Sequence, residues 1–292
     1  MSALAVVLRM GVDRQASSLG LNAAFRGTAG VVTLIFAAFH IDWGRFPELW
    51  RVAGWAGMLA SVFFWFAGFA SIKAVQLGPL SVSWTVLRCS MVLPAMASLL
   101  YWQEVPLAPV SRTLVLRLLG MGIIFASMVV LGLDRLGRER RNKSSIQVGR
   151  GSVKVWLWWL VAVFWGEGAW EISLRATRSF PDNETRLFFV TLVFIGAFVI
   201  TLPVMGLAGA KMGRFEWGYG SLAGVCGMAA SGSRVWALRD VDGMVVFPVT
   251  TVSVMLLVQL AGCLGWREKT SRMGWAGFLC AIAGVLFLTL KI

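Results

Sequence analysis

Long apolar segments, separated by short polar stretches, run through almost the entire chain. Most are about 20 residues long, the length that an α-helix needs to cross the hydrocarbon core of a bilayer. The pattern predicts nine full membrane-spanning helices, over residues 21–40, 54–77, 79–102, 113–133, 155–175, 186–207, 217–237, 243–264 and 273–290. Residues 1–10 predict only a partial tenth, because ten helical residues reach about 15 Å.

The longest polar segment, residues 134–154, carries seven arginines and lysines and divides the chain almost in half. The same landmarks follow in the same order on both sides of it: Arg26 and Arg186, Ala74 and Ala237, Trp102-Gln103-Glu104 and Trp266-Arg267-Glu268, and Gly120 and Gly277. Because each half has an odd number of helices, the second half enters the membrane inverted. This predicts two inverted five-helix repeats, residues 1–133 and 155–292, joined by a basic linker, 134–154. That plan is found in secondary transporters, whose sites lie near the bilayer midplane.

Composition supports an all-α integral membrane protein. Hydrophobic residues make up 58% of the chain, charged residues 14%, and the mean hydropathy is +0.76. Soluble domains are about a quarter charged, so a soluble globule or a disordered chain is excluded. The net charge of +13 does not indicate a nucleic-acid partner, because the basic residues lie between apolar segments, as loops beside a lipid bilayer do.

Cysteine and histidine usage restricts the chemistry. The four cysteines have no paired metal-site spacing, and His40 is the only histidine. Zinc motifs and Ser-His or Cys-His catalytic pairs therefore lack their residues, so we expect no metal, no cofactor and no enzymatic activity.

Several of these landmarks resemble the drug/metabolite transporter superfamily in its ten-helix EamA-type form. The matching residues are Trp165-Gly166 in FWGEGAWEIS, Arg186, Ala237-Leu238, Pro248 in VVFPVTTV, Glu268 in WREK and Gly277, with Arg26, Ala74, Glu104 and Gly120 in the first half. The first half departs from the pattern at Trp84-Thr85, where the second has Pro248. The resemblance covers essentially the whole chain and implies the fold and the superfamily, but not the substrate.

The resemblance also implies a full first helix with its own Trp-Gly, whereas AVVLRM matches only the second half of such a helix. We therefore expect Met1 to be an internal start or a truncation. Family members keep both termini in the cytoplasm, which would place residues 134–154 outside. The positive-inside rule would place them inside, so the orientation stays open.

Charged residues within predicted spans are the candidate site. Glu167 falls near the middle of the helix 155–175, Glu171 follows one turn later, and Trp165 and Trp170 flank the first glutamate. Burial favours a protonated carboxylate, and aromatic faces hold cations, so we predict proton coupling or cation binding here. The resemblance supports this, because small multidrug members also carry an essential glutamate in a repeat's opening helix. The structural alternative is that Glu171 pairs with Arg175 and that Glu167 packs against another basic side chain.

A second set of candidates lies on the helices 79–102 and 243–264. Arg88 shares a helical face with Thr85, and we expect it either to bind a substrate carboxylate or phosphate or to be the counter-charge of Glu167. Thr251 and Gln259 form a milder polar stripe, which is also typical of helix–helix hydrogen bonding. Arg26, Arg186, Glu104 and Glu268 are interpreted as topological or capping charges at helix ends.

Two functions remain open. The first is a secondary-active exporter or permease of a small metabolite, amino acid or cationic drug in a plasma (bacterial inner) membrane, working by alternating access with or without proton coupling. The second is a non-transporting accessory or scaffold protein, which the incomplete first helix favours.

Overall fold

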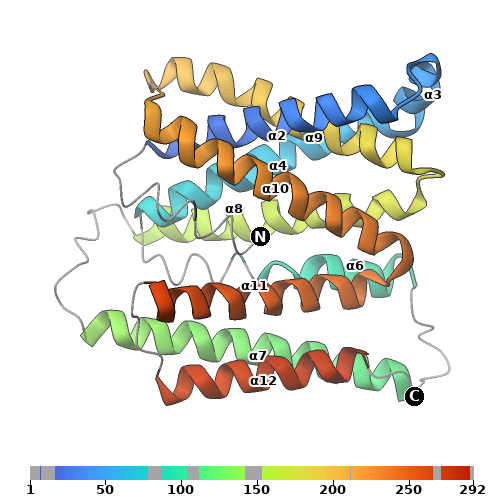
Figure 1. The fold of residues 1–292 in the computed structure, drawn as a ribbon. Helices are drawn as coiled ribbons and strands as arrows, with labels where there is room; N and C mark the ends of the chain where they lie inside the picture. The colour runs from blue at the N-terminus through green and yellow to red at the C-terminus, as the bar shows by residue number, and fades with distance from the viewer. Residues whose placement is uncertain are drawn as a thin grey trace. The chain divides into compact units, whose positions relative to one another are not determined.

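The structure is a computed structural model that describes residues 7, 17–77, 87, 89–103, 112–141, 153–210, 212–265 and 271–289. Within these ranges it consists of helices joined by short turns, with no strand (Figure 1). The helices and short helical turns are α2 (Ser18–His40), η1 (Trp43–Arg45), α3 (Phe46–Leu49), η2 (Trp50–Gly54), α4 (Trp55–Leu77), α6 (Val92–Leu100), α7 (Arg112–Arg141), α8 (Val153–Ala176), η3 (Thr177–Ser179), α9 (Asn183–Leu207), α10 (Arg214–Asp240), α11 (Gly243–Gly265) and α12 (Arg272–Thr289).

Three helical segments of the described chain are long and apolar enough to cross a membrane: Leu19–His40, Trp43–Ser71 and Asn183–Leu207. Shorter apolar helices lie at Leu114–Ser127, Gly243–Val254 and Arg272–Phe287. These findings are compatible with a membrane location, as the hydropathy pattern predicts.

Most predicted helix boundaries agree with the structure to within a few residues, with one correction. Residues 134–141 were predicted as the start of a loop, but α7 continues through them to Arg141. The connection between the first two full spans forms η1, α3 and η2, because Asp42 caps η1 and Pro47 occupies the first turn of α3. The predicted partial helix 1–10 lies outside the described residues apart from Val7, as does most of 79–91.

The chain divides into two compact units, each built from both halves of the sequence. Unit 1 comprises Met1–Gly68 and Ser173–Asp240, and unit 2 comprises Phe69–Ile172 and Val241–Ile292. The boundaries of the two units therefore do not coincide with the predicted linker at residues 134–154. Two of these boundaries fall inside helices, one within α4 and one within α8.

In unit 1, α2 packs against both α9 and α10 (Figure 1). The α2–α9 pair is antiparallel, because Gly27 lies beside Phe198, Gly30 beside Ile195, and the Thr191 hydroxyl donates to the Thr33 carbonyl at 3.4 Å. A Cβ at Gly224 of α10 would meet the Phe25 carbonyl of α2 at 2.5 Å, so glycine allows the backbones to approach closely. Gly224 begins a run rich in small residues, GVCGMAASGS, over residues 224–233.

In unit 2, α7 packs along α12, and α11 packs against α6 and α12. A Cβ at Gly284 of α12 would meet the Gly120 carbonyl of α7 at 2.9 Å, so this helix pair is also closely packed. Buried apolar residues of unit 2 form clusters, which comprise Met91, Ile124, Val252 and Ala281; Ala70, Ala74, Leu160 and Val163 between α4 and α8; and Leu99, Leu114 and Met244.

Candidate functional site

The predicted glutamates on α8 lie on the enclosed side of that helix. Glu171 is buried, with 8% of its surface exposed, Trp170 is buried beside it in sequence, and Glu167 is half-buried. Gly168 explains this orientation, because α8 meets Leu93 of α6 at that residue, within one turn of Glu171. Both glutamates belong to unit 2.

The two tryptophans predicted to flank Glu167 differ in exposure. Trp165 is 61% exposed, whereas Trp170 is 3% exposed. Residues 165 and 167 are about 200° apart around an α-helix, so one is exposed when the other is enclosed. Trp170 therefore stays a candidate beside the carboxylates, while Trp165 is an outward-facing aromatic residue.

The other predicted site residues are placed only in part. Thr251 is buried in α11 and is 5% exposed, in keeping with a polar stripe inside the helix bundle of unit 2. The backbone of α11 includes Gln259. Thr85 and Arg88 lie outside the described residues.

A buried arginine in unit 1 was misinterpreted from the sequence. Arg26 was predicted to be a charge at a helix end, but α2 begins at Ser18 and places Arg26 two turns inside. The side chain is only 1% exposed. The signal for the true helix start is Ser17, whose hydroxyl accepts a hydrogen bond from the Gly20 N–H, as an N-cap residue does.

Hydrogen bonds and aromatic contacts hold the Arg26 guanidinium between α2, α4 and α9. It donates to the Thr201 hydroxyl at 3.1 Å and to the Phe64 and Trp65 carbonyls at 3.3 and 3.2 Å. Its central carbon lies 5.3 Å from the centre of the Phe64 ring, so a cation–π contact adds to the hydrogen bonds. We call Arg26, Phe64, Trp65, Gly68 and Thr201 the Arg26 centre.

Gly68 makes room for that arginine. A Cβ at this position would collide with the Arg26 Nη2 atom. The missing side chain therefore lets the guanidinium reach carbonyl groups one turn earlier on α4. A hydrogen bond to a charged donor contributes about 1.5–3 kcal/mol, so the Arg26 centre is a strong bond between α2, α4 and α9.

The capping role predicted for Arg186 is confirmed by its hydrogen bonds. It lies in the first turn of α9 and donates to the Thr177 carbonyl at 3.2 Å and the Phe180 carbonyl at 2.7 Å. It also donates to the Asn183 side chain at 3.0 Å. The arginine thus fixes the turn between α8 and α9. Glu104 and Glu268, the other predicted capping charges, lie outside the described residues.

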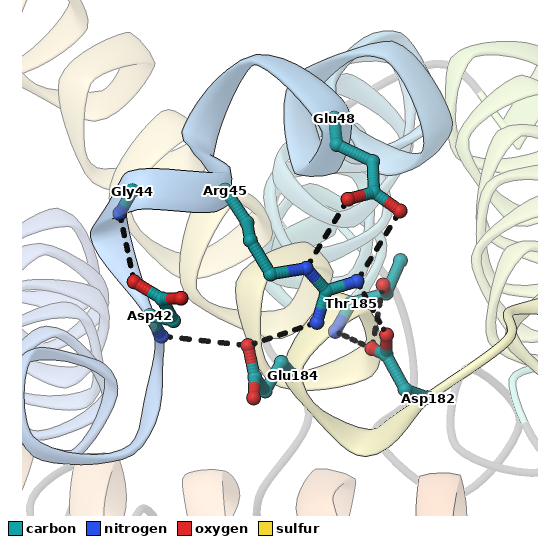
Figure 2. Close-up of polar contacts among 7 residues, drawn as sticks. All are labelled: Asp42, Gly44, Arg45, Glu48, Asp182, Glu184 and Thr185. Carbon is teal, nitrogen blue, oxygen red and sulfur yellow. Dashed lines mark hydrogen bonds and ion pairs between the residues drawn. The ribbon is translucent and has the colours of Figure 1, made fainter.

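A second arginine of unit 1, Arg45, is surrounded by carboxylates at the helix ends (Figure 2). It contacts Glu48 at 3.1 Å, Asp182 at 3.0 Å and Glu184 at 3.4 Å. The Asp42 backbone N–H also donates to Glu184 at 3.4 Å. These residues, which we call the Arg45 cluster, join the segment after α2 to the start of α9. About one third of the surface of Arg45, Asp182 and Glu184 is exposed.

Asp182 has a second role as the N-cap of α9. Its carboxylate accepts from the Thr185 N–H and hydroxyl, both at 2.7 Å. Partial burial opposes ionisation, but the hydrogen bonds from Thr185 and Arg45 outweigh it and hold the pKa of this carboxyl below its usual value. Within the described ranges, no three such carboxylate, histidine or cysteine residues form a group that could hold a metal ion.

Comparison with known proteins identifies the fold but no function. No family model matches the chain, and no curated protein matches it. Among solved structures, the chain resembles one described only as "Crystal structure of protein", with a TM-score of 0.69 and 15% sequence identity. The match covers 99% of this chain and 94% of that one, so the fold is shared over nearly the full length of both.

Proposed function

We propose that this chain is a secondary-active membrane transporter of the EamA-like, ten-helix plan, built from two inverted five-helix repeats in the plasma membrane. The observation that carries the proposal is the antiparallel packing of α2 on α9. The sequence landmarks Arg26 and Arg186 designate these two helices as corresponding members of the repeats. Repeats related by a two-fold axis in the membrane plane require corresponding helices to run in opposite directions.

Other helix pairs support the same plan. The predicted repeats also match α7 with α12 and α6 with α11, and each pair is in contact in unit 2. Each compact unit thus combines corresponding helices from both halves of the chain. Packing of corresponding helices against each other is expected when two inverted repeats fold together.

Buried charges support transport over a purely structural role. Glu171 is buried within the apolar helix α8, where an ionisable residue is costly and generally marks a pathway for ions or substrates. We assign proton coupling or cation binding to Glu171 and Glu167, with Trp170 and Thr251 beside the pathway and Arg88 shaping it. The substrate class is a small metabolite, an amino acid or a cationic drug.

Transport by reconstituted protein tests this function. Proteoliposomes containing the dye pyranine report proton movement when an amino-acid mixture or ethidium is added under an imposed pH gradient. We expect Glu171→Gln to abolish substrate-driven proton movement and Glu167→Gln to reduce it. Asp240→Asn, which changes an exposed carboxylate, is the matched control and should transport normally. Equal proton movement in all three variants would reject the coupling assignment.

The inverted architecture has its own test. Single cysteines placed after α2 and after α9, at Asp42 and Gly209, mark corresponding ends of the two repeats. We expect a membrane-impermeant maleimide to label one position from outside intact cells and the other only after permeabilisation. Labelling of both from the same side would reject the inverted repeat, whatever the result of the transport assay.

A further inference from the structure

The charges buried in the described part of the chain are mostly positive. Five arginines and one glutamate there have at most 8% of their surface exposed, and they are Arg26, Arg117, Arg175, Arg186, Arg234 and Glu171. Arginine stays protonated in proteins, so its charge persists wherever the residue is buried. Charges interact more strongly in a low-dielectric interior than in water, so the buried charges of the described residues favour an anion over a cation.

One of these arginines, Arg117, lies where three helices of unit 2 meet. Leu99 on α6, Leu114 on α7 and Met244 on α11 form one buried apolar cluster there. Arg117 follows Leu114 by one turn, and its side chain is 10% exposed. Side chains of a helix tilt towards its N-terminus, so Arg117 reaches back towards Asp242, which directly precedes α11. A charged group is thus enclosed between α7 and the start of α11.

The nitrogen atoms of the Arg117 guanidinium differ in their contacts. Nη1 donates to the Asp242 carboxylate at 3.0 Å. Nε is buried and has no hydrogen-bond partner within the residues that the structure describes. Nε and Nη2 form the edge of an arginine that binds a carboxylate side-on, through two parallel hydrogen bonds. Arg117 therefore presents a buried, charged donor for which a second carboxylate is the matching acceptor.

A second polar atom beside the same cluster also lacks a partner. Ser98 precedes Leu99 in α6, is fully buried, and has a hydroxyl with no hydrogen-bond partner in the described ranges. Buried polar groups of folded proteins nearly always have a partner, because an unsatisfied group costs stability. Two unsatisfied donors beside one helix contact therefore point to a ligand that accepts hydrogen bonds.

We propose that Arg117 binds the carboxylate of an anionic substrate through Nε and Nη2, with the Ser98 hydroxyl as a further donor. The inference rests on the proposed transport function and narrows its substrates to small organic anions, such as dicarboxylates and acidic amino acids. Asp242 pairs with Arg117 before the substrate binds and repels a second carboxylate on the same guanidinium. Because Nε is enclosed in this conformation, the substrate reaches it when α7 and the start of α11 move apart, a movement of the kind that alternating access requires.

Binding to the purified full chain in detergent tests the site. Succinate and L-glutamate are the anionic probes and tetraphenylphosphonium is the cationic probe, and each is titrated while tryptophan fluorescence follows the thermal unfolding midpoint. We expect the carboxylates to raise the midpoint and the cation to leave it unchanged. Arg117→Gln should weaken carboxylate binding about tenfold or more, because it removes hydrogen bonds from a charged donor. Arg112→Gln, which removes an exposed charge at the start of the same helix, should bind as wild type does.

Asp242→Asn provides a second test that does not depend on the folding of Arg117→Gln. This variant keeps the arginine and removes the negative charge beside it, so carboxylates should bind about fivefold more tightly than to wild type. A merely structural ion pair would instead lower the unfolding midpoint of both variants and leave carboxylate affinity unchanged. Unchanged affinity in Asp242→Asn would overturn the proposal, as would stabilisation of wild type by tetraphenylphosphonium but by neither carboxylate.

The anion site and the transport function fail in different experiments. Carboxylate binding that depends on Arg117, without substrate-driven proton movement, would reject the transporter and leave Arg117 as an anion-binding residue. Equal proton movement by wild type and Arg117→Gln at subsaturating succinate would reject the anion site and leave the transporter standing.

Discussion

Two arginines of unit 1 attach different segments to α9 in opposite ways. Arg26 is buried within the apolar part of α2 and donates to backbone carbonyls and a hydroxyl. Arg45 lies at the helix ends, is about one third exposed and pairs with three carboxylates. Both join the α2–α4 region to α9.

The difference shows how environment sets the strength of a contact. Water and salt screen the exposed ion pairs of the Arg45 cluster, so each contributes little. The Arg26 centre excludes water, so the loss of its hydrogen bonds would leave buried polar groups unsatisfied. The contacts of the Arg26 centre should therefore persist in the folded protein, whereas those of the Arg45 cluster should be weak and should break and re-form.

Removal of the buried arginine should have the largest effect. Arg26→Met leaves the Thr201 hydroxyl without this donor and removes the link to α4, so we expect a loss of about 3 kcal/mol in unfolding free energy. Thermal unfolding in detergent, followed by tryptophan fluorescence, measures the change. Arg112→Gln, an exposed arginine at the start of α7, is the control. A comparable midpoint in both variants would contradict the assigned strength of the Arg26 centre.

A methyl group at Gly68 should have the next largest effect. Gly68→Ala collides with the Arg26 guanidinium, and overpacking of this kind costs about 1–3 kcal/mol. Gly232→Ala of α10 meets nothing within 4 Å and should instead stabilise the helix by about 0.5–1 kcal/mol. The same unfolding measurement shows which substitution lowers the free energy of unfolding and which raises it. Stabilisation by both substitutions would mean that Gly68 is not needed to accommodate the arginine.

Loss of Arg45 should have a smaller effect that depends on salt. Arg45→Gln removes its pairs with Glu48, Asp182 and Glu184 and should lower the thermal unfolding midpoint slightly at low ionic strength. The difference from wild type should shrink in 1 M salt, because the pairs are then screened. The cost of Arg26→Met should remain unchanged by salt. An effect of Arg45→Gln that does not depend on salt would contradict the proposed difference between the exposed Arg45 cluster and the buried Arg26 centre.

Acid should weaken the Arg45 cluster slightly. The folded-state pKa of Asp182 lies below its ordinary value of 3.8, so its stabilising contribution is present above that pH and is lost as the pH falls through the folded-state pKa. Wild type should therefore lose its stability advantage over Asp182→Asn when unfolding is measured at successively lower pH from 6 to 3. If the stability advantage of wild type over Asp182→Asn instead grew as the pH fell, the pKa of Asp182 would not be lowered in the folded state.

Local patterns predicted the helices well but not the depth of individual residues. The apolar segments located α2, α4 and α8 to α12 to within a few residues, because a bilayer-length helix leaves a strong hydropathy signal. Basic residues made 134–141 look like a loop, although α7 continues there. Arginine has a high helix propensity, so charge alone did not mark the end of the helix.

The candidate site could be predicted only in part, because exposure depends on neighbouring helices. Spacing placed Glu167 and Glu171 on one face, and the contact of α8 with α6 at Gly168 encloses that side. Trp165 is exposed whereas Glu167 is half-buried, because the two positions are about 200° apart around the helix. The Arg26 centre was missed because its acceptors lie 38, 39 and 175 residues away in sequence.

The amino-acid sequence by itself determined that this protein is helical, apolar and suited to a membrane, because these properties follow from the length, period and composition of local segments. Tertiary structure alone decided which charges are buried and what they contact. Arg26 and Arg45 are the same residue type only 19 positions apart. Their different roles arise because packing of α2, α4 and α9 removes water from one and leaves the other at the surface.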